Sequence, residues 1–181
     1  MKLALRYYGD PVLKTPARTV RKVDERIRQL AADMIETMRA EGGIGLAAQQ
    51  VGVTDSICVI EVPPAMEEAP TARPDLPMPL VLLNPRVIAE SAETETAEEG
   101  CLSFRDIRAP ICRPREVTVR WLGLDGAEQE ARLSGLLGRC VQHEMDHLAG
   151  VLISDRMSAV KRIALAGRLK RLQRETAALL G

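Results

Sequence analysis

Both histidines of this 181-residue chain fall within one short stretch, Gln142-His143-Glu144-Met145-Asp146-His147. On a helix, residues four apart lie on one face, so the two imidazoles can reach a single metal ion. Glu144 then lies beside that ion, where a general base for a bound water would stand. A surface helix that carries two histidines by chance is the alternative. The stretch therefore predicts a helix that carries a catalytic metal.

A catalytic metal usually has three protein ligands, so a third must come from elsewhere in the chain. Ile153 stands where a metzincin-type protease would carry its third histidine. Asp155 lies just past the predicted helix end and Glu175 lies late in the terminal helix, so neither carboxylate is well placed. Cys101 is the better candidate, because a thiolate binds divalent metals strongly and Gly100 before it permits a close backbone approach. A buried cysteine with no metal is the competing interpretation.

A segment of small residues, 42–50, follows the first predicted helix. Its glycines do not fit a phosphate loop, because a helix precedes them and no Gly-Lys-Ser/Thr follows. A backbone that lies close to a ligand suits them better, with Gln50 supplying an amide donor.

Composition narrows the class of protein. The formal net charge is zero and aromatic residues make up 2% of the chain, so neither a strong field nor stacking platforms point to nucleic acid. No apolar run is long enough to span a bilayer, and Gly9-Asp10-Pro11 comes too early for a signal peptide. We therefore expect a cytoplasmic protein with one domain over residues 1–181. Its four cysteines are expected to be reduced thiols or ligands.

Hydrophobic periodicity and turn signals set out the elements. A helix is expected over residues 24–41, capped by Asp24 and ended by Gly42-Gly43. The proline-rich stretch 63–79 indicates a long surface loop. We predict short buried strands at 56–62 and 80–83, a hairpin formed by 116–122 and 127–133, the motif helix at 134–148 and a final helix at 158–180.

The final helix is strongly basic at its polar positions. Against Glu175 alone it carries six cations: Lys161, Arg162, Arg168, Lys170, Arg171 and Arg174. A solvated face is the plain interpretation, and docking on a polyanion such as RNA is the alternative.

Three segments together resemble the peptide deformylases. Residues 43–50, 99–103 and 142–147 match, in order, the family motifs Gly-Φ-Gly-Φ-Ala-Ala-x-Gln, Glu-Gly-Cys-Φ-Ser and Gln-His-Glu-Φ-Asp-His, where Φ is apolar. Residues 9–13 and the final helix are also similar to the family, so the resemblance covers essentially the whole chain. It implies an α+β fold in which antiparallel strands surround a central metal-binding helix, with an N-terminal and a C-terminal helix.

The resemblance implies a metal-dependent hydrolase that removes the N-formyl group from the N-terminal formyl-methionine of new polypeptides and releases formate. The metal, Fe²⁺ in the cell with Ni²⁺, Co²⁺ or Zn²⁺ as alternatives, would be bound by three ligands, Cys101, His143 and His147. Hydroxide formed at the metal would attack the formyl carbon, with Glu144 as general acid/base. Gln50 and the Leu102 backbone N–H would hold the oxyanion.

The substrate is expected to contact the same segments. By the resemblance, Ile44 and Gly45 pair with the substrate backbone, and Gly100 lies at the same site. Leu136 and Cys140, on the motif helix before His143, are candidates for the methionine pocket.

Two features depart from the family pattern. The chain reads Phe104-Arg105-Asp106 where the family commonly has a proline, and the loop 63–79 is longer than in compact members. We expect both features to affect which peptides are preferred as substrates rather than the reaction itself. Arg108 and Arg113 could contact the substrate or Asp146, or could form structural salt bridges.

Other functions remain open at this point. A zinc endopeptidase shares the His-Glu-x-x-His pattern, a deformylase relative could act on another N-formyl compound, and a structural metal module could dock on RNA. We expect formylmethionyl nascent peptides as partners and a possible ribosome contact through the basic final helix. We expect no membrane, no sequence-specific nucleic acid and a monomer.

Overall fold

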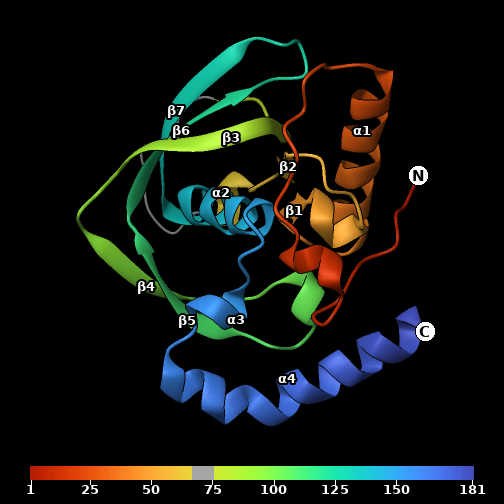
Figure 1. Cartoon of the computed structure of the whole chain (residues 1–181). Helices are drawn as coiled ribbons and strands as arrows, with labels where there is room; N and C mark the ends of the chain where they lie inside the picture. Colours follow the sequence, from red (N-terminus) through yellow and green to blue (C-terminus); the bar gives the residue numbers. More distant parts are fainter. Residues whose placement is uncertain (67–75) are drawn as a thin grey trace.

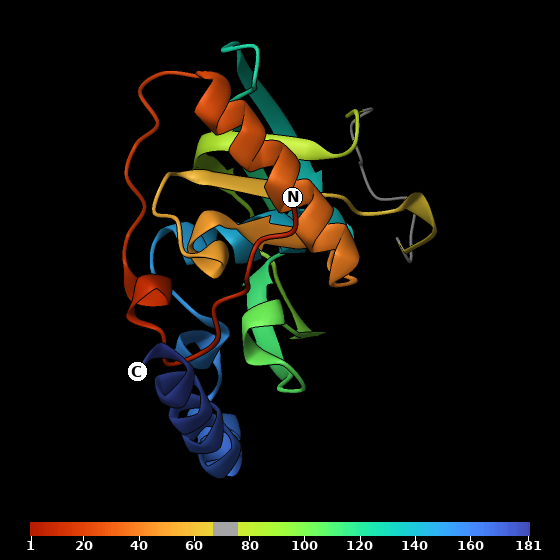
Figure 2. The ribbon, with the colours of Figure 1, turned by 90° about the vertical axis from the view of Figure 1, so that its right-hand side faces the viewer.

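Antiparallel strands surround a central helix, α2 (Gly135–Leu148), in the computed structural model, which describes residues 1–66 and 76–181 (Figure 1). Helices α1 (Glu25–Ala40) and α4 (Ala159–Leu180) pack outside the strands, and the short α3 (Ile153–Arg156) leads into α4. The predicted α+β arrangement is confirmed. In Figures 1 and 2, α4 lies at the end of the molecule opposite the turn between β6 and β7.

Within residues 1–66 and 76–181, seven strands form two antiparallel sheets. Five of these strands follow the order β1-β2-β3-β6-β7, and β4 and β5 pair with each other. The strands are β1 (Gly45–Ala47), β2 (Ile57–Ile60), β3 (Leu80–Glu90), β4 (Thr94–Glu99), β5 (Ala109–Pro114), β6 (Glu116–Leu122) and β7 (Glu128–Ser134). Short 3-10 helices occupy Pro11–Lys14, Ala48–Val51, Pro64–Met66 and Leu102–Phe104.

Strand β2 is apolar throughout because both of its faces are buried. Successive side chains of a strand point to opposite faces. Cys58 and Ile60 belong to the core that includes α2, whereas Ile57 and Val59 belong to the core beneath α1. A strand buried on both faces has no polar alternation, so the sequence here reads as a continuous apolar run.

Helix α1 follows its prediction closely. The Asp24 side chain accepts a hydrogen bond from the Ile27 backbone N–H, as an N-cap should. Met34 and Met38 are fully buried in the core, as expected of a helix with one apolar stripe. The predicted hairpin, motif helix and final helix are likewise present, with boundaries close to the prediction.

The region between β2 and β6 differs from the prediction. The strand expected at 80–83 continues to Glu90. The register with β6 shifts after Leu83, where Asn84 has a φ of 49°, and pairing resumes at Arg86, so the two halves form one strand. Strands β4 and β5 were not predicted, because β4 is largely exposed and acidic while β5 carries two prolines. Of the loop predicted at 63–79, residues 67–75 lie outside the described residues.

Helix α4 packs through one apolar stripe. Its buried residues include Leu165, Leu169 and Leu172, which share a core with Leu13 and Phe104. Within the described ranges, no helix is both long enough and apolar enough to cross a membrane.

Candidate active site

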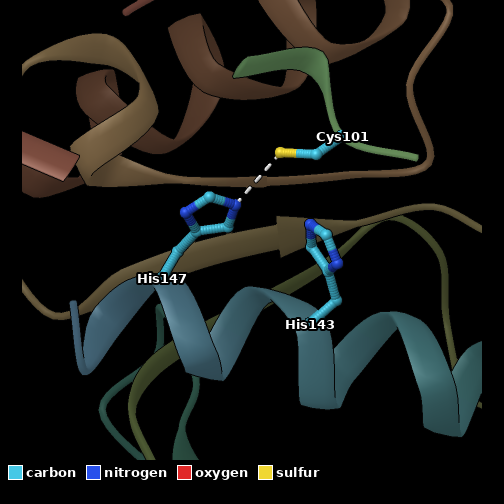
Figure 3. A group of neighbouring side chains, drawn as sticks. All are labelled: Cys101, His143 and His147. Carbon is cyan, nitrogen blue, oxygen red and sulfur yellow. Dashed lines mark hydrogen bonds between the residues drawn. The ribbon is translucent and has the colours of Figure 1, made fainter. Parts of the chain in front are cut away.

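Helix α2 places two imidazoles beside one thiol. His143 and His147 leave the same face of the helix, with ring centroids 5.1 Å apart. Cys101 follows β4, and its Sγ lies above the two rings, with a dashed line to His147 (Figure 3). The metal-ligating atoms of the three residues all lie within 4.8 Å of one another, and Cys101 Sγ is 3.3 Å from His147 Nε2. The predicted ligand set is therefore assembled.

The chemistry of this donor set fits a divalent transition metal. A thiolate and two imidazoles are ligands that Zn²⁺, Fe²⁺, Ni²⁺ and Co²⁺ accept. His143 Nδ1 lies 3.0 Å from Glu99 Oε2, so a carboxylate fixes the ring and leaves Nε2 for a metal. His147 Nδ1 is buried and has no hydrogen-bond partner within the described ranges.

The pKa values of the two histidines are shifted in opposite directions. Burial, the largest effect, lowers the His143 pKa, but hydrogen bonds with Cys101 and Glu99 outweigh it and place that pKa well above its usual value. Burial and the nearby His143 push the His147 pKa well below its usual value. His147 is therefore held as the neutral imidazole, the form that binds a metal.

Glu144 is a buried carboxylate at the same site. Only 3% of the residue is exposed, and burial raises its pKa to about 7. Its Oε2 atom has no hydrogen-bond partner within the described residues. Gly45 makes room for this carboxylate, because a Cβ there would lie 2.7 Å from Cys140 Sγ and closer still to Glu144 Oε1. The structure thus holds a proton-exchanging group near neutrality beside the ligands.

Gln50 is anchored at one end and directed at the ligands at the other. Its Oε1 accepts from the Ala47 backbone N–H at 2.8 Å. Its Nε2 lies 3.3 Å from Ser103 Oγ and 3.5 Å from Cys101 Sγ. The amide N–H therefore faces the Cys101 thiol, and Leu102 follows that cysteine at the start of a short 3-10 helix.

A cavity of about 530 Å³ opens beside these groups. Its lining includes every predicted site residue except His147, which is 1% exposed. These lining residues are Ile44, Gly45, Gln50, Gly100, Cys101, Leu102, Leu136, Cys140, His143 and Glu144. The structure brings the predicted set together, while the individual roles stay predictions.

Sequence reasoning missed the carboxylate Glu99. Burial, the largest effect, would raise its pKa, but hydrogen bonds from Arg113 and His143 outweigh it and hold the pKa at about 2. Arg113 Nε and Nη2 donate to Glu99 at 2.5 and 2.9 Å, and Arg113 Nη1 donates to Asp146 at 2.8 Å. Glu99 is therefore a permanently charged partner for His143.

A signal for the Arg113 contacts was present in the sequence. Ala109, Ile111 and Arg113 alternate along β5 and are all buried, so the arginine occupies a core-facing position. A charged residue at such a position requires a buried partner. The Arg113 interaction is thus a buried salt bridge that includes Asp146, one of the alternatives raised above.

Of the described residues that depart from the family pattern, Met66, Arg105 and Asp106 line the cavity, whereas Phe104 is fully buried in the core under α4. Arg105 adopts a φ of 51°, stacks its guanidinium 4.5 Å above the Tyr7 ring and bonds to Glu175 on α4 at 3.0 Å. Arg108 is 61% exposed and pairs with Glu98. Both arginines line the mouth with their charges already paired.

The carboxylates considered as alternative ligands are engaged elsewhere. Asp155 pairs with Lys14 and accepts from the Leu152 backbone N–H at 2.8 Å. Glu175 pairs with Arg105 and Arg171 on the exposed face of α4. A thermolysin-like ligand set, which needs a downstream carboxylate at the metal, is therefore not formed.

Comparison with known proteins gives one consistent result. The family model described as "Polypeptide deformylase" matches residues 2–163. A peptide deformylase of Opitutus terrae is 40% identical and covers 98% of this chain and 96% of its own length. One from Nitrosococcus oceani is 41% identical, with 97% and 98% covered.

Solved structures agree with these matches. The crystal structure of peptide deformylase from Ehrlichia chaffeensis superposes with a TM-score of 0.87 at 36% identity, covering 97% of this chain and 98% of that one. A Synechococcus elongatus peptide deformylase in complex with actinonin gives a TM-score of 0.80 at 39% identity, covering 94% and 85%.

Proposed function

This chain belongs to the peptide deformylase family of hydrolases, and from that premise we propose how its own residues remove the N-formyl group of a new polypeptide and release formate. One observation carries the function. Three metal-binding side chains and the buried Glu144 carboxylate meet beside a cavity with room for a peptide end.

The metal would be held by Cys101, His143 and His147. We propose Fe²⁺ as the ion in the cell, with Ni²⁺, Co²⁺ and Zn²⁺ able to occupy the same ligands. Such an ion supplies Lewis acidity, lowering the pKa of a bound water and polarising the formyl carbonyl.

Glu144 moves the proton. A carboxylate with a pKa of about 7 can accept a proton from the attacking water and release it to the departing amine. Its Oε2 lacks a hydrogen-bond partner among the described residues, which leaves that atom available for water. General acid–base catalysis of this kind contributes roughly 10²–10⁴ in rate.

Gln50 stabilises the developing negative charge. The bond from Ala47 fixes the amide so that Nε2 faces the Cys101 side of the site. The backbone N–H of Leu102 would act as a second donor to the same oxygen. Removal of one donor from such a site typically costs roughly 10²–10³ in rate.

The open edge of β1 would hold the substrate backbone. β1 is the last strand of the five-stranded sheet and pairs with β2 alone within the described chain. The Ile44 carbonyl accepts from the Glu61 N–H on the β2 side at 2.8 Å. Successive backbone groups alternate, so Gly45 presents its N–H and C=O to the open edge. An extended peptide can add there as a further strand.

The methionine side chain would enter the cavity beside Leu136 and Cys140, which Gly100 also lines. The lack of a Cβ at Gly45 keeps the space beside Glu144 narrow but open. A formyl carbon carries only hydrogen, so this space suits formyl better than a larger acyl group.

Formate release from a formyl-Met peptide tests the function. Protein loaded with Fe²⁺ under anaerobic conditions should release formate, and Glu144→Ala should keep its metal while losing turnover. Formyl-Leu and acetyl-Met peptides serve as matched substrates for the side-chain pocket and the acyl site. If metal-replete wild type yields no formate, or if Glu144→Ala is equally active, the proposed function is wrong. Cleavage of internal peptide bonds instead would favour an endopeptidase.

We further propose a cytoplasmic monomer with one catalytic domain over residues 1–181. Formylated nascent peptides are its partners, and the basic face of α4 would contact the ribosome. Most of the cations on this face, such as Arg162, Lys170 and Arg174, are exposed. Co-sedimentation with ribosomes tests this contact, because reversing these charges should abolish it without altering hydrolysis of a free peptide.

A further inference from the structure

Arg139 is a largely buried cation that connects three elements of the site. Its Nη1 donates to Glu99 Oε1 and to the Ile111 carbonyl, both at 2.9 Å, and its Nη2 donates to the Glu95 carbonyl at 2.9 Å. The side chain is 11% exposed. Arg139 lies on α2, whereas its partners lie on β4 and β5. One side chain thus fastens the histidine-bearing helix to both strands of the small sheet.

The small sheet needs such a fastening. Strands β4 and β5 pair only with each other in the described chain, and a two-stranded sheet is marginally stable alone. This sheet nevertheless carries Glu99 and leads directly into Cys101, the one ligand that is not on α2. The position of the thiol relative to the imidazoles therefore depends on how firmly the sheet is held against the helix.

Two arginines hold it from different directions. Arg113 belongs to β5 and reaches α2 only at Asp146, three residues after His143. Arg139 starts from α2, four residues before His143, and reaches both strands. Both donate to Glu99, whose Oε2 contacts His143. With these contacts, the acceptor positions of the Glu99 carboxylate are filled.

We propose that Arg139 is a positioning residue of the metal site, which holds Glu99 and the Cys101 segment against the histidine helix and so slows release of the metal. This inference rests on the proposed function only in taking these residues as metal ligands. The guanidinium fork matters, because a lysine ammonium is a single point charge and does not reach acceptors on two strands at once. Removal of outer partners of metal ligands typically costs roughly 10–100-fold in metal affinity.

Metal release measured without turnover tests the proposal. The full chain is loaded with Co²⁺, challenged with excess chelator and followed by the loss of the thiolate–cobalt absorption. Arg139→Met keeps an apolar stem of similar length and should release Co²⁺ roughly 10–100-fold faster than wild type. Arg139→Lys should fall between the two.

Arg120→Met is the matched control. Arg120 also joins neighbouring elements through a carboxylate, donating to Glu130 at 2.7 and 2.9 Å across β6 and β7, away from the ligands. This variant should release Co²⁺ at the wild-type rate. Circular dichroism well below the melting transition shows whether each variant is folded. If Arg139→Met does not fold, Arg139→Lys carries the same test.

The outcomes separate the two claims. Wild-type release rates in a folded Arg139 variant would overturn this proposal, as would equal acceleration in Arg120→Met. Uptake of Co²⁺ without any formate release would overturn the proposed function and leave Arg139 as a positioning residue of a metal site. A wild-type chain that takes up no Co²⁺ would overturn both.

Discussion

Helices α2 and α4 are both rich in polar residues but use them differently. On α2, four polar side chains of the motif are buried: Gln142, His143, Glu144 and His147. On α4 the buried positions are mainly leucines, and the cations lie at the surface. Burying a charge costs free energy unless partners satisfy it, whereas a solvated charge costs little. The fold therefore bears a free-energy cost of burying polar groups around α2, where the metal-ligating residues lie, and almost no such cost on α4.

The largest expected effect comes from breaking the buried salt bridge at α2. Arg113→Met removes the cation that Glu99 and Asp146 share and leaves Glu99 with Arg139 and Asp146 with Arg156, so the loss should approach the roughly 3–5 kcal/mol that removal of one partner of a buried pair costs. The midpoint of denaturant unfolding should fall accordingly. Arg171→Met on α4 is the control, because it removes only an exposed bridge to Glu175 and should leave the midpoint nearly unchanged. If the unfolding midpoint shifted equally in both variants, the proposed difference between α2 and α4 would be wrong.

The next effect concerns the free-energy cost of holding Glu144 in the core. Its pKa is about 7 in the folded chain, against an ordinary value of 4.5. Between these values the folded chain binds a proton that the unfolded chain has lost, so wild-type stability falls as pH rises through this window. Glu144→Gln cannot titrate. In chelator-treated, metal-free protein at pH 8, we expect this variant to be more stable by about 3 kcal/mol.

Unfolding curves measured from pH 4 to 8 check this expectation. The two proteins should have similar stability near pH 4 and diverge up to about pH 7. Parallel curves would mean that the Glu144 carboxylate is not destabilised by its burial. A more stable but inactive Glu144→Gln would illustrate a catalytic group retained at the expense of stability.

The smallest effect compares the space beside α2, at Gly45 of β1, with the space on α4. Gly45→Ala drives a methyl group into Glu144 and Cys140 and should cost about 1–3 kcal/mol, with a larger loss of kcat/KM. Gly167→Ala on α4 meets no atom within 4 Å and should stabilise the helix by about 0.5–1 kcal/mol. Thermal unfolding together with formate release measures both. Activity that survives in Gly45→Ala would remove the argument for close approach at β1.

Local signals explain which parts could be predicted. The Asp24 cap and the paired glycines mark both ends of α1, and the spacing of His143 and His147 places them on one helix face. Cys101 could be proposed as a ligand because both histidines were already used. The family resemblance then supplied the remaining expectations, and the family, the fold and the metal site are confirmed.

Long-range pairing explains what could not be predicted. The residues of β4, Thr-Glu-Thr-Ala-Glu-Glu, have no apolar alternation, and they form a strand only because β5 lies beside them. Arg139 is separated from Glu95 and Glu99 by 44 and 40 positions, so nothing local connects it to either. The register shift at Asn84 depends in the same way on β6, which allows β3 to continue.

The open edge of β1 has a consequence for the range of substrates. The N–H and C=O groups that Gly45 offers would pair with any residue, because every amino acid presents the same backbone apart from proline, which lacks the N–H. Backbone pairing of this kind discriminates little among the residues encoded after the start codon. Any preference at those positions would have to come from side chains at the mouth, such as Arg105 and Arg108, and not from this strand of three residues.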